Sequence, residues 1–103
     1  HTQSFNHVIG TQTTKGITIP NLYSSFHVYS IEWSPEKIIF LVDDKQYLEF
    51  FNQHKTVNEW PFDKPFYLIL NLAVGGNWGG KMGVDENIFP AAMQVDYVRV
   101  YNK

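Results

Sequence analysis

The chain has 103 residues, a formal charge of −2 and no cysteine. This length suits one domain with one core, and the charge argues against nucleic-acid binding, which would need a basic patch. Without cysteine, a disulfide framework and a thiolate metal site are excluded. No run of 18 apolar residues is present that could span a membrane. The aromatic content of 17% is high, as in the aromatic-rich β-sandwiches to which many sugar-binding proteins belong.

Strand-like patterns begin at the first residue. Residues 1–9 are rich in residue types that favour strands. An extended backbone would place His1 and Gln3 on one face, and His7 lies in the same predicted strand. Because the chain opens inside this pattern and lacks an initiator Met, we expect that its N-terminus is not the natural start of the gene product. A short strand is expected at 16–19.

Three further strands are expected at 26–33, 37–42 and 46–51. The turn signals Ser34-Pro35-Glu36 and Asp43-Asp44-Lys45 separate them. Together they predict an antiparallel meander.

The longest apolar run, 66–74, lies between Pro65 and Gly75. These boundaries predict a buried strand rather than a helix. Asn71 is its one polar side chain, so it must find hydrogen-bond partners in the core or line a wet groove. Trp78 follows in a glycine-rich loop, where the ring could meet a ligand or simply cap the core. The run by itself supports an ordinary core strand and a binding site equally.

The chain closes with an alternating strand pattern at 94–101. Six or seven short strands with regular turn signals, and no amphipathic helix pattern, predict an all-β antiparallel sandwich.

No catalytic constellation can be identified from the residues. Glycoside hydrolysis usually needs two carboxylates placed across one bond, yet no two acidic residues lie two positions apart, and Glu32 stands alone on its strand. The four histidines are scattered, so a transition-metal site is not expected. No Gly-x-Ser-x-Gly motif or phosphate-binding loop occurs.

Five segments together resemble one known family, and they occur in the family's order along nearly the whole chain. They are His1-Thr2-Gln3-Ser4-Phe5-Asn6-His7, residues 26–33, Trp60-Pro61-Phe62-Asp63, residues 71–80 and residues 95–101. This set resembles the bacterial laminarinases of glycoside hydrolase family 16.

The resemblance implies a jelly-roll, concanavalin A-like sandwich, of which residues 1–103 form about the C-terminal half of the catalytic domain. Family enzymes are endo-acting, retaining β-glucanases, so the implied parent is a glycosidase that hydrolyses laminarin-type β-1,3-glucan. Their signature, Glu-x-Asp-x-x-Glu, belongs on a strand before His1 and is absent here. We therefore expect this chain alone to be inactive, and the parent to be secreted or periplasmic.

Four residues match substrate-contacting positions of the family: His1, Gln3, Asn71 and Trp78. Trp33 and Trp60 resemble core residues instead. No cofactor is required. Asp96 matches a position that holds a structural calcium ion in family members, but one carboxylate would make a weak site.

Three hypotheses follow from the sequence. The chain is a fragment of an endo-β-1,3-glucanase, a non-catalytic module that binds β-glucan, or a self-associating sandwich. In the last case its partner is a second copy, as a homodimer, or the missing N-terminal half, because half a sandwich leaves strand edges uncovered.

Overall fold

The computed structural model describes residues 1–102 and divides into two compact units, residues 1–66 and residue 67 onward. Regular structure is sparse in both. The first unit contains three strands, and the second contains one turn of α-helix and one 3-10 turn. No helix in the described range is long and apolar enough to cross a membrane.

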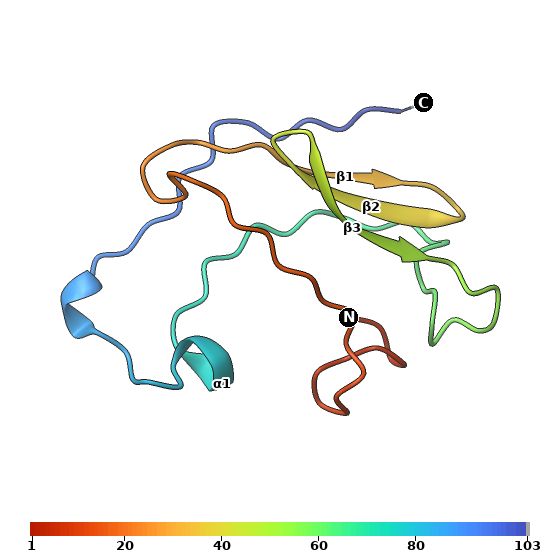
Figure 1. Cartoon of the computed structure of the whole chain (residues 1–103), viewed down its shortest axis with the longest axis horizontal. Coiled ribbons are helices and arrows are strands. Elements are labelled where there is room, and N and C mark those ends of the chain that lie inside the picture. The colour runs from red at the N-terminus through yellow and green to blue at the C-terminus, as the bar shows by residue number, and fades with distance from the viewer. Residues whose placement is uncertain (103) are drawn as a thin grey trace. The chain divides into compact units, whose positions relative to one another are not determined.

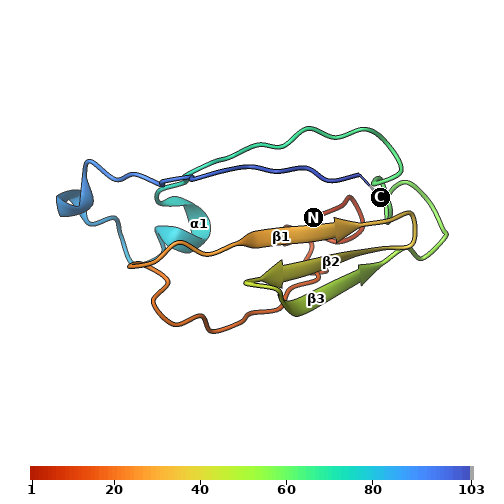
Figure 2. The same ribbon diagram turned by 90° about the horizontal axis from the view of Figure 1, so that it is seen from above.

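The predicted meander is present. Strands β1 (Tyr29–Trp33), β2 (Lys37–Val42) and β3 (Lys45–Phe51) form one antiparallel sheet in the order β1-β2-β3 (Figures 1 and 2). The β1–β2 turn is closed by Ser34, whose N–H donates to the Lys37 carbonyl at 2.9 Å and whose hydroxyl accepts from the Lys37 N–H at 3.1 Å. Residues 26–28, predicted as part of the first strand, precede the ladder.

A two-residue turn joins β2 to β3. Asp43 and Asp44 both have positive φ, 49° and 63°, between the paired residues Val42 and Lys45. Two positive φ angles are the mark of a type I′ turn, which matches the twist of hairpin strands. The Asp43 carboxylate also accepts from the Val28 N–H at 2.9 Å, so this turn ties the hairpin to the segment before β1.

Replacing Asp44 with glycine should stabilise the first unit by roughly 0.5–1 kcal/mol, because glycine adopts positive φ without steric strain. Asp43→Gly is the matched control, since it also removes the carboxylate that accepts from Val28 and should destabilise the unit. Urea denaturation followed by circular dichroism measures both. A neutral Asp44→Gly together with a stabilising Asp43→Gly would show that the strain lies elsewhere.

The Asp43 carboxylate also pairs with His27. The Nδ1 of His27 lies 2.6 Å from Asp43 Oδ2, and its Nε2 lies 3.3 Å from the Asn21 carbonyl oxygen. Both ring nitrogens face acceptors, so a charged imidazolium satisfies both. The hydrogen bond to Asp43, then the Asn21 carbonyl, raises the pKa of His27 above 6.5. The stability that this raised pKa contributes is complete below pH 6.5 and is lost as the pH rises through the folded-state pKa.

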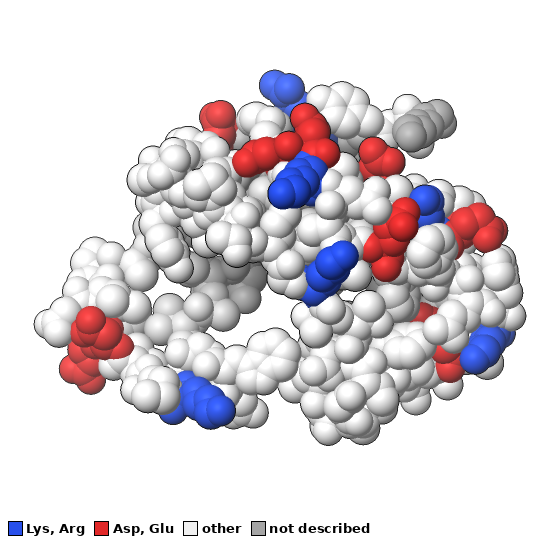
Figure 3. Space-filling view, viewed as in Figure 1, with Lys and Arg blue, Asp and Glu red and all other residues white. Residues whose placement is uncertain are grey.

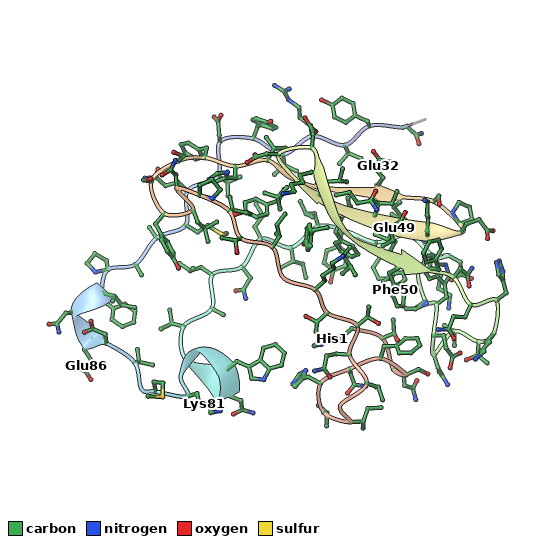
Figure 4. The ribbon with its side chains drawn as sticks, in the orientation of Figure 1. His1, Glu32, Glu49, Phe50, Lys81 and Glu86 are labelled. Carbon is green, nitrogen blue, oxygen red and sulfur yellow. The ribbon has the colours of Figure 1, made fainter. Side chains whose placement is uncertain are left out.

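The register gives the sheet one apolar face. Its side chains are Tyr29, Ile31, Trp33, Ile38, Phe40, Val42, Leu48 and Phe50. The opposite face is mixed: Lys37 and Glu49 form an ion pair at 2.8 Å across β2 and β3, and Glu32 lies on the same face (Figure 4). This alternation is why the segments fold as a half-buried sheet.

An aromatic cluster packs on the apolar face. Trp60 stacks on Phe50 with ring centroids 5.7 Å apart and meets Phe62 edge-on at 5.2 Å. Within the described residues, the buried apolar side chains are Ile38, Val42 and Trp60. The β1 part of the face is more open, since Trp33 is 46% exposed.

The prediction of a strand at residues 1–9 is wrong. Asn6 folds this segment into a loop: its side-chain oxygen accepts from the Val8 N–H at 3.1 Å, and its Nδ2 donates to the Gln3 carbonyl at 2.9 Å. Such side-chain bonds compete with a strand ladder. His1 and His7 consequently meet, with ring centroids 4.9 Å apart. Residues 16–19, predicted as a strand, also form no ladder.

Glu59 fastens this loop to a capped turn at 56–60. One carboxylate oxygen accepts from the Ser4 hydroxyl at 2.7 Å, and the other accepts from the Thr56 hydroxyl at 2.6 Å and the Thr56 N–H at 3.0 Å. The bond from the Thr56 N–H to the Glu59 carboxylate is the one that the glutamate makes in a capping box. These hydrogen bonds, the Thr56 and Ser4 hydroxyls first, lower the pKa of Glu59 from 4.5 to about 2.

Glu59→Gln should make the first unit less sensitive to acid. Because the pKa of Glu59 is lower when folded, its contribution is complete above pH 4.5 and is lost as the pH falls toward 2. Urea midpoints measured at neutral and acid pH should therefore fall less steeply in the variant. Glu86→Gln, at an exposed acid in the second unit, should keep the full slope. Equal slopes for Glu59→Gln and the unchanged chain would contradict this role.

In the second unit, the predicted strands at 66–74 and 94–101 are not formed. Residues 67–74 and 94–101 join no ladder within the described part of the chain. The predicted burial is wrong too: Leu68 is 64% and Ile69 70% exposed, on opposite faces of the run. An extended segment becomes a strand only by pairing with a neighbour, and residues 1–102 supply none to either segment.

Between these segments lie the helical turn α1 (Gly76–Gly79) and the 3-10 turn η1 (Glu86–Ile88) (Figure 1). The side chain of Asp85 accepts from the Asn87 N–H at 2.9 Å and caps η1. On the face shown in Figure 3, basic side chains are interspersed with acidic ones.

Candidate functional site

The predicted site residues are divided between the two units. His1 and Gln3 belong to the N-terminal loop of the first unit. Asn71, Trp78 and Asp96 belong to the second.

Trp78 is presented by α1. Gly75 and Gly76 have φ of 76° and 77°, a region that favours glycine, and they turn the chain into the helical turn. The turn closes through the Gly80 N–H, which donates to the Gly76 carbonyl at 3.0 Å. A Cβ on Gly80 would come within 2.8 Å of that same carbonyl oxygen, so the backbone needs glycine there. The Trp78 side chain is 68% exposed.

The segment that carries Trp78 was predicted as a loop, without the helical turn. A four-residue turn that contains two glycines shows no helical periodicity, so the pattern could not reveal it. Exposure of Trp78 rules out a ring that caps the core within this chain.

Asn71 is exposed in the middle of the 67–74 segment. It makes no hydrogen bond to any other described residue, so it is not the satisfied core amide that the sequence also allowed. Its amide offers one acceptor and two donors to a polar ligand.

His1 lies beside a small cavity in the first unit. The cavity has a volume of about 70 Å³ and is lined by His1, Thr2, Phe5, Thr13, Phe40, Leu48, Phe50 and Phe62. His1 and Phe50 are labelled in Figure 4. Gln3, two residues further along the chain, is exposed to solvent. Its carbonyl oxygen accepts a hydrogen bond from the Asn6 side chain. The loop thus leaves both side chains available to solvent, although not in the alternating arrangement of a strand.

A larger groove, of about 630 Å³, was not expected from the sequence. It is lined by Trp33, Ser34, Pro35, Glu36, Asn52, His54, Trp60, Phe62, Asp63, Lys64 and Pro65. Glu36 and His54 form an exposed pair at 2.9 Å on its wall. These two residues are 18 positions apart in different turns, and no motif in the sequence indicates their contact.

The predicted roles of the other two tryptophans have different outcomes. Trp60 is 5% exposed, so the prediction that it is a core residue is confirmed. The same prediction for Trp33 is wrong, because it lies on the open β1 edge. Its indole N–H donates to the Phe62 carbonyl at 3.0 Å.

Glu32 and Glu49 lie in one row of the sheet. Both are opposite Ile39, one on each side, so two strand spacings of about 4.8 Å separate their backbones. Glu49 is paired with Lys37, whose ammonium lowers the pKa of Glu49. A carboxylate held ionised by a lysine is unsuited to act as a general acid.

Asp96 lies in the extended 94–101 segment. Among residues 1–102 no three His, Asp or Glu side chains gather into a metal-binding group. Asp96 would be the single carboxylate of a calcium site, and its other ligands would have to be carbonyls or water. These residues do not by themselves fit a tight calcium site.

A family model described as Glycosyl hydrolases family 16 matches residues 1–99. A beta-glucanase of Rhodothermus marinus is 53% identical over 106 residues, which cover 98% of this chain and 37% of that protein. The chain thus spans little more than a third of the length of this relative.

Solved structures agree with this match. The laminarinase from Rhodothermus marinus superposes with a TM-score of 0.81 at 48% identity, covering 87% of this chain and 38% of that one. A mutant of SCLam, a non-specific endo-beta-1,3(4)-glucanase, was co-crystallised with 1,3-beta-D-cellotriosyl-glucose. It gives a TM-score of 0.80 at 44% identity, covering 86% of this chain and 34% of that one. The likeness confirms the predicted fold class, the antiparallel β-sandwich of jelly-roll type.

Proposed function

Because this chain belongs to glycosyl hydrolase family 16, we propose that it is the C-terminal half of the catalytic domain of a retaining endo-β-1,3-glucanase. The parent enzyme would hydrolyse laminarin-type β-glucan. Such a polymer is too large to enter a cell, so a secreted or periplasmic location fits the substrate.

In this proposal the chain contributes part of the wall of the substrate cleft. Trp78 stacks on a pyranose ring, since an exposed indole offers a flat apolar face to the C–H groups of a sugar. Asn71, His1 and Gln3 hydrogen-bond the sugar hydroxyls. The observation that carries the proposal is the exposure of Trp78 on a glycine-framed turn, in a chain that matches the family along 99 residues.

The chain alone is proposed to bind without cleaving. A retaining enzyme needs two carboxylates about 5–5.5 Å apart, and the row that holds Glu32 and Glu49 spaces their backbones by two strands and pairs Glu49 with Lys37. No cofactor is needed for this chemistry, and no step of it involves a metal ion at Asp96.

Affinity electrophoresis in a gel containing laminarin tests the binding part. We expect the 103-residue chain to be retarded relative to its mobility in a plain gel and in a gel containing dextran, an α-linked glucan. Equal mobility in laminarin and dextran gels would contradict a β-glucan site.

A reducing-sugar assay on the same preparation distinguishes a chain that only binds β-glucan from one that also cleaves it. We expect no release of reducing ends from laminarin. Retardation without release supports the cleft-wall role, and release would show that a carboxylate pair operates within these residues.

A non-catalytic β-glucan-binding module is the second candidate. The two candidates make the same prediction for this chain and differ only in the protein from which it comes. A longer gene product that contains the Glu-x-Asp-x-x-Glu strand would exclude the non-catalytic module.

A further inference from the structure

Thr2 determines which side chains of the N-terminal loop face solvent. Its N–H donates to the Phe5 carbonyl at 2.9 Å, and its hydroxyl accepts from the Phe5 N–H at 3.1 Å. Thr2 itself is only 9% exposed, whereas His1 and Gln3 on either side of it are exposed. The bonds that bury Thr2 therefore leave both of the proposed sugar-contacting side chains in solvent.

Ser4 ties this loop to the turn at 56–60. Its N–H donates to the Asn58 carbonyl at 2.9 Å, and its hydroxyl donates to Glu59 Oε1 at 2.7 Å, across 55 positions of sequence. The Phe5 ring adds an edge-on contact with Phe50 of β3, with 5.7 Å between the ring centroids. The bonds between Thr2 and Phe5 lie within the loop, whereas those of Ser4 hold the loop against the rest of the first unit.

Glu59 is itself held in place, so it can serve as a fixed anchor. Its second oxygen, Oε2, accepts from the Thr56 hydroxyl at 2.6 Å and from the Thr56 N–H at 3.0 Å. Because the Thr56 and Ser4 hydroxyls lower the pKa of Glu59 to about 2, the carboxylate is ionised throughout the neutral range. A hydrogen bond to an ionised carboxylate is stronger than one between neutral groups.

We propose that Glu59, acting through Ser4, is a positioning residue for β-glucan binding, because it holds the N-terminal loop in the place from which His1 and Gln3 bond sugar hydroxyls. The inference rests on the proposed function, in which these two side chains contact the substrate. Side chains that are already ordered lose less conformational freedom when a ligand binds. The anchor thus raises the affinity without touching the sugar.

Calorimetric titration of Ser4→Ala with a laminarin oligosaccharide tests this role. The variant keeps the bonds between Thr56 and Glu59 but loses the hydroxyl that joins Glu59 to the loop. We expect about tenfold weaker binding, because the loop must then be ordered when the sugar binds. Ser4→Thr keeps a hydroxyl and should restore the affinity of the unchanged chain.

Ser34→Ala is the matched control, since it also removes a serine hydroxyl from the first unit. That hydroxyl donates to the Lys37 carbonyl at 3.0 Å in the β1–β2 turn, away from the loop. The variant should lower the urea midpoint and leave the affinity unchanged. Tight binding by Ser4→Ala, or equally weakened binding by Ser34→Ala, would overturn the inference.

The mobility of Gln3, measured without glucan, separates this inference from the proposed function. By NMR relaxation we expect an order parameter of about 0.85 for its backbone amide in the unchanged chain and in Ser4→Thr, and below about 0.6 in Ser4→Ala. This difference in a chain that binds no glucan would support the anchor and contradict the proposed function. An equally rigid Gln3 in Ser4→Ala would overturn the anchor, whether or not the unchanged chain binds glucan.

Discussion

Trp60→Ala is expected to destabilise the first unit by about 3–5 kcal/mol, the range found when a large aromatic is removed from a core. Trp60 is one of the few buried apolar side chains of residues 1–66, and it packs against both Phe50 and Phe62. Without it the sheet loses the ring that stacks on Phe50. Since small domains are stable by only about 5–15 kcal/mol, the variant should lose a large part of its stability and unfold at a much lower urea concentration, as followed by circular dichroism.

Two further variants locate the cause of this loss. The Trp60 Nε1 is buried and has no hydrogen-bond partner among residues 1–102. Trp60→Phe keeps an aromatic ring and removes this unpaired donor, so its loss of stability should be much smaller. Tyr23→Ala, at a fully exposed aromatic residue, should change stability by no more than about 0.5 kcal/mol. If Trp60→Ala unfolds at the urea concentration of the unchanged chain, the aromatic cluster is not the core.

Trp78→Ala is expected to have the largest effect on binding. Burying an aromatic side chain against a ligand is worth about 1.5–3 kcal/mol, which corresponds to roughly ten- to hundredfold in affinity. Trp78 stands on the exposed turn α1, so its removal should leave the fold intact. Calorimetric titration with a laminarin oligosaccharide measures the change in affinity, and the urea midpoint checks the stability.

A control for this experiment is Tyr23→Ala, which removes an exposed aromatic side chain from outside the proposed cleft wall. Its affinity for the oligosaccharide should equal that of the unchanged chain. If both variants bind equally well, Trp78 does not contact the sugar and the proposed stacking is wrong.

The sequence could predict the meander because its signals are local. Alternation in 29–33 and 37–42 is clear, and Asp43-Asp44 marks a hairpin turn between two apolar runs. The glycines on both sides of Trp78 left two possibilities open, a ring that meets a ligand or one that caps the core, and only the structure shows that Trp78 is 68% exposed.

The strand predictions that failed did so because strand formation depends on neighbours rather than on composition. Segment 67–74 has the composition of a buried strand, but the described residues contain no partner strand for it, so its side chains stay exposed. At the N-terminus, the side chain of Asn6 satisfies the backbone locally and replaces a ladder with a loop. Strand propensity alone predicts neither the lack of a partner strand nor the competing hydrogen bonds of the Asn6 side chain.

The tertiary contacts of the first unit were also beyond the sequence. Ser4 meets Glu59 across 55 residues, and Glu36 meets His54 across 18. Both pairs form between turns, where no periodicity or motif spacing fixes the partner.

The most direct test of the cleft-wall role is an NMR titration of the three tryptophan indole N–H resonances with a laminarin oligosaccharide. The proposal predicts that the Trp78 resonance shifts, while those of the buried Trp60 and of Trp33, bonded to the Phe62 carbonyl, stay in place. A titration that leaves the Trp78 resonance unmoved, or moves only those of Trp33 and Trp60, would contradict it.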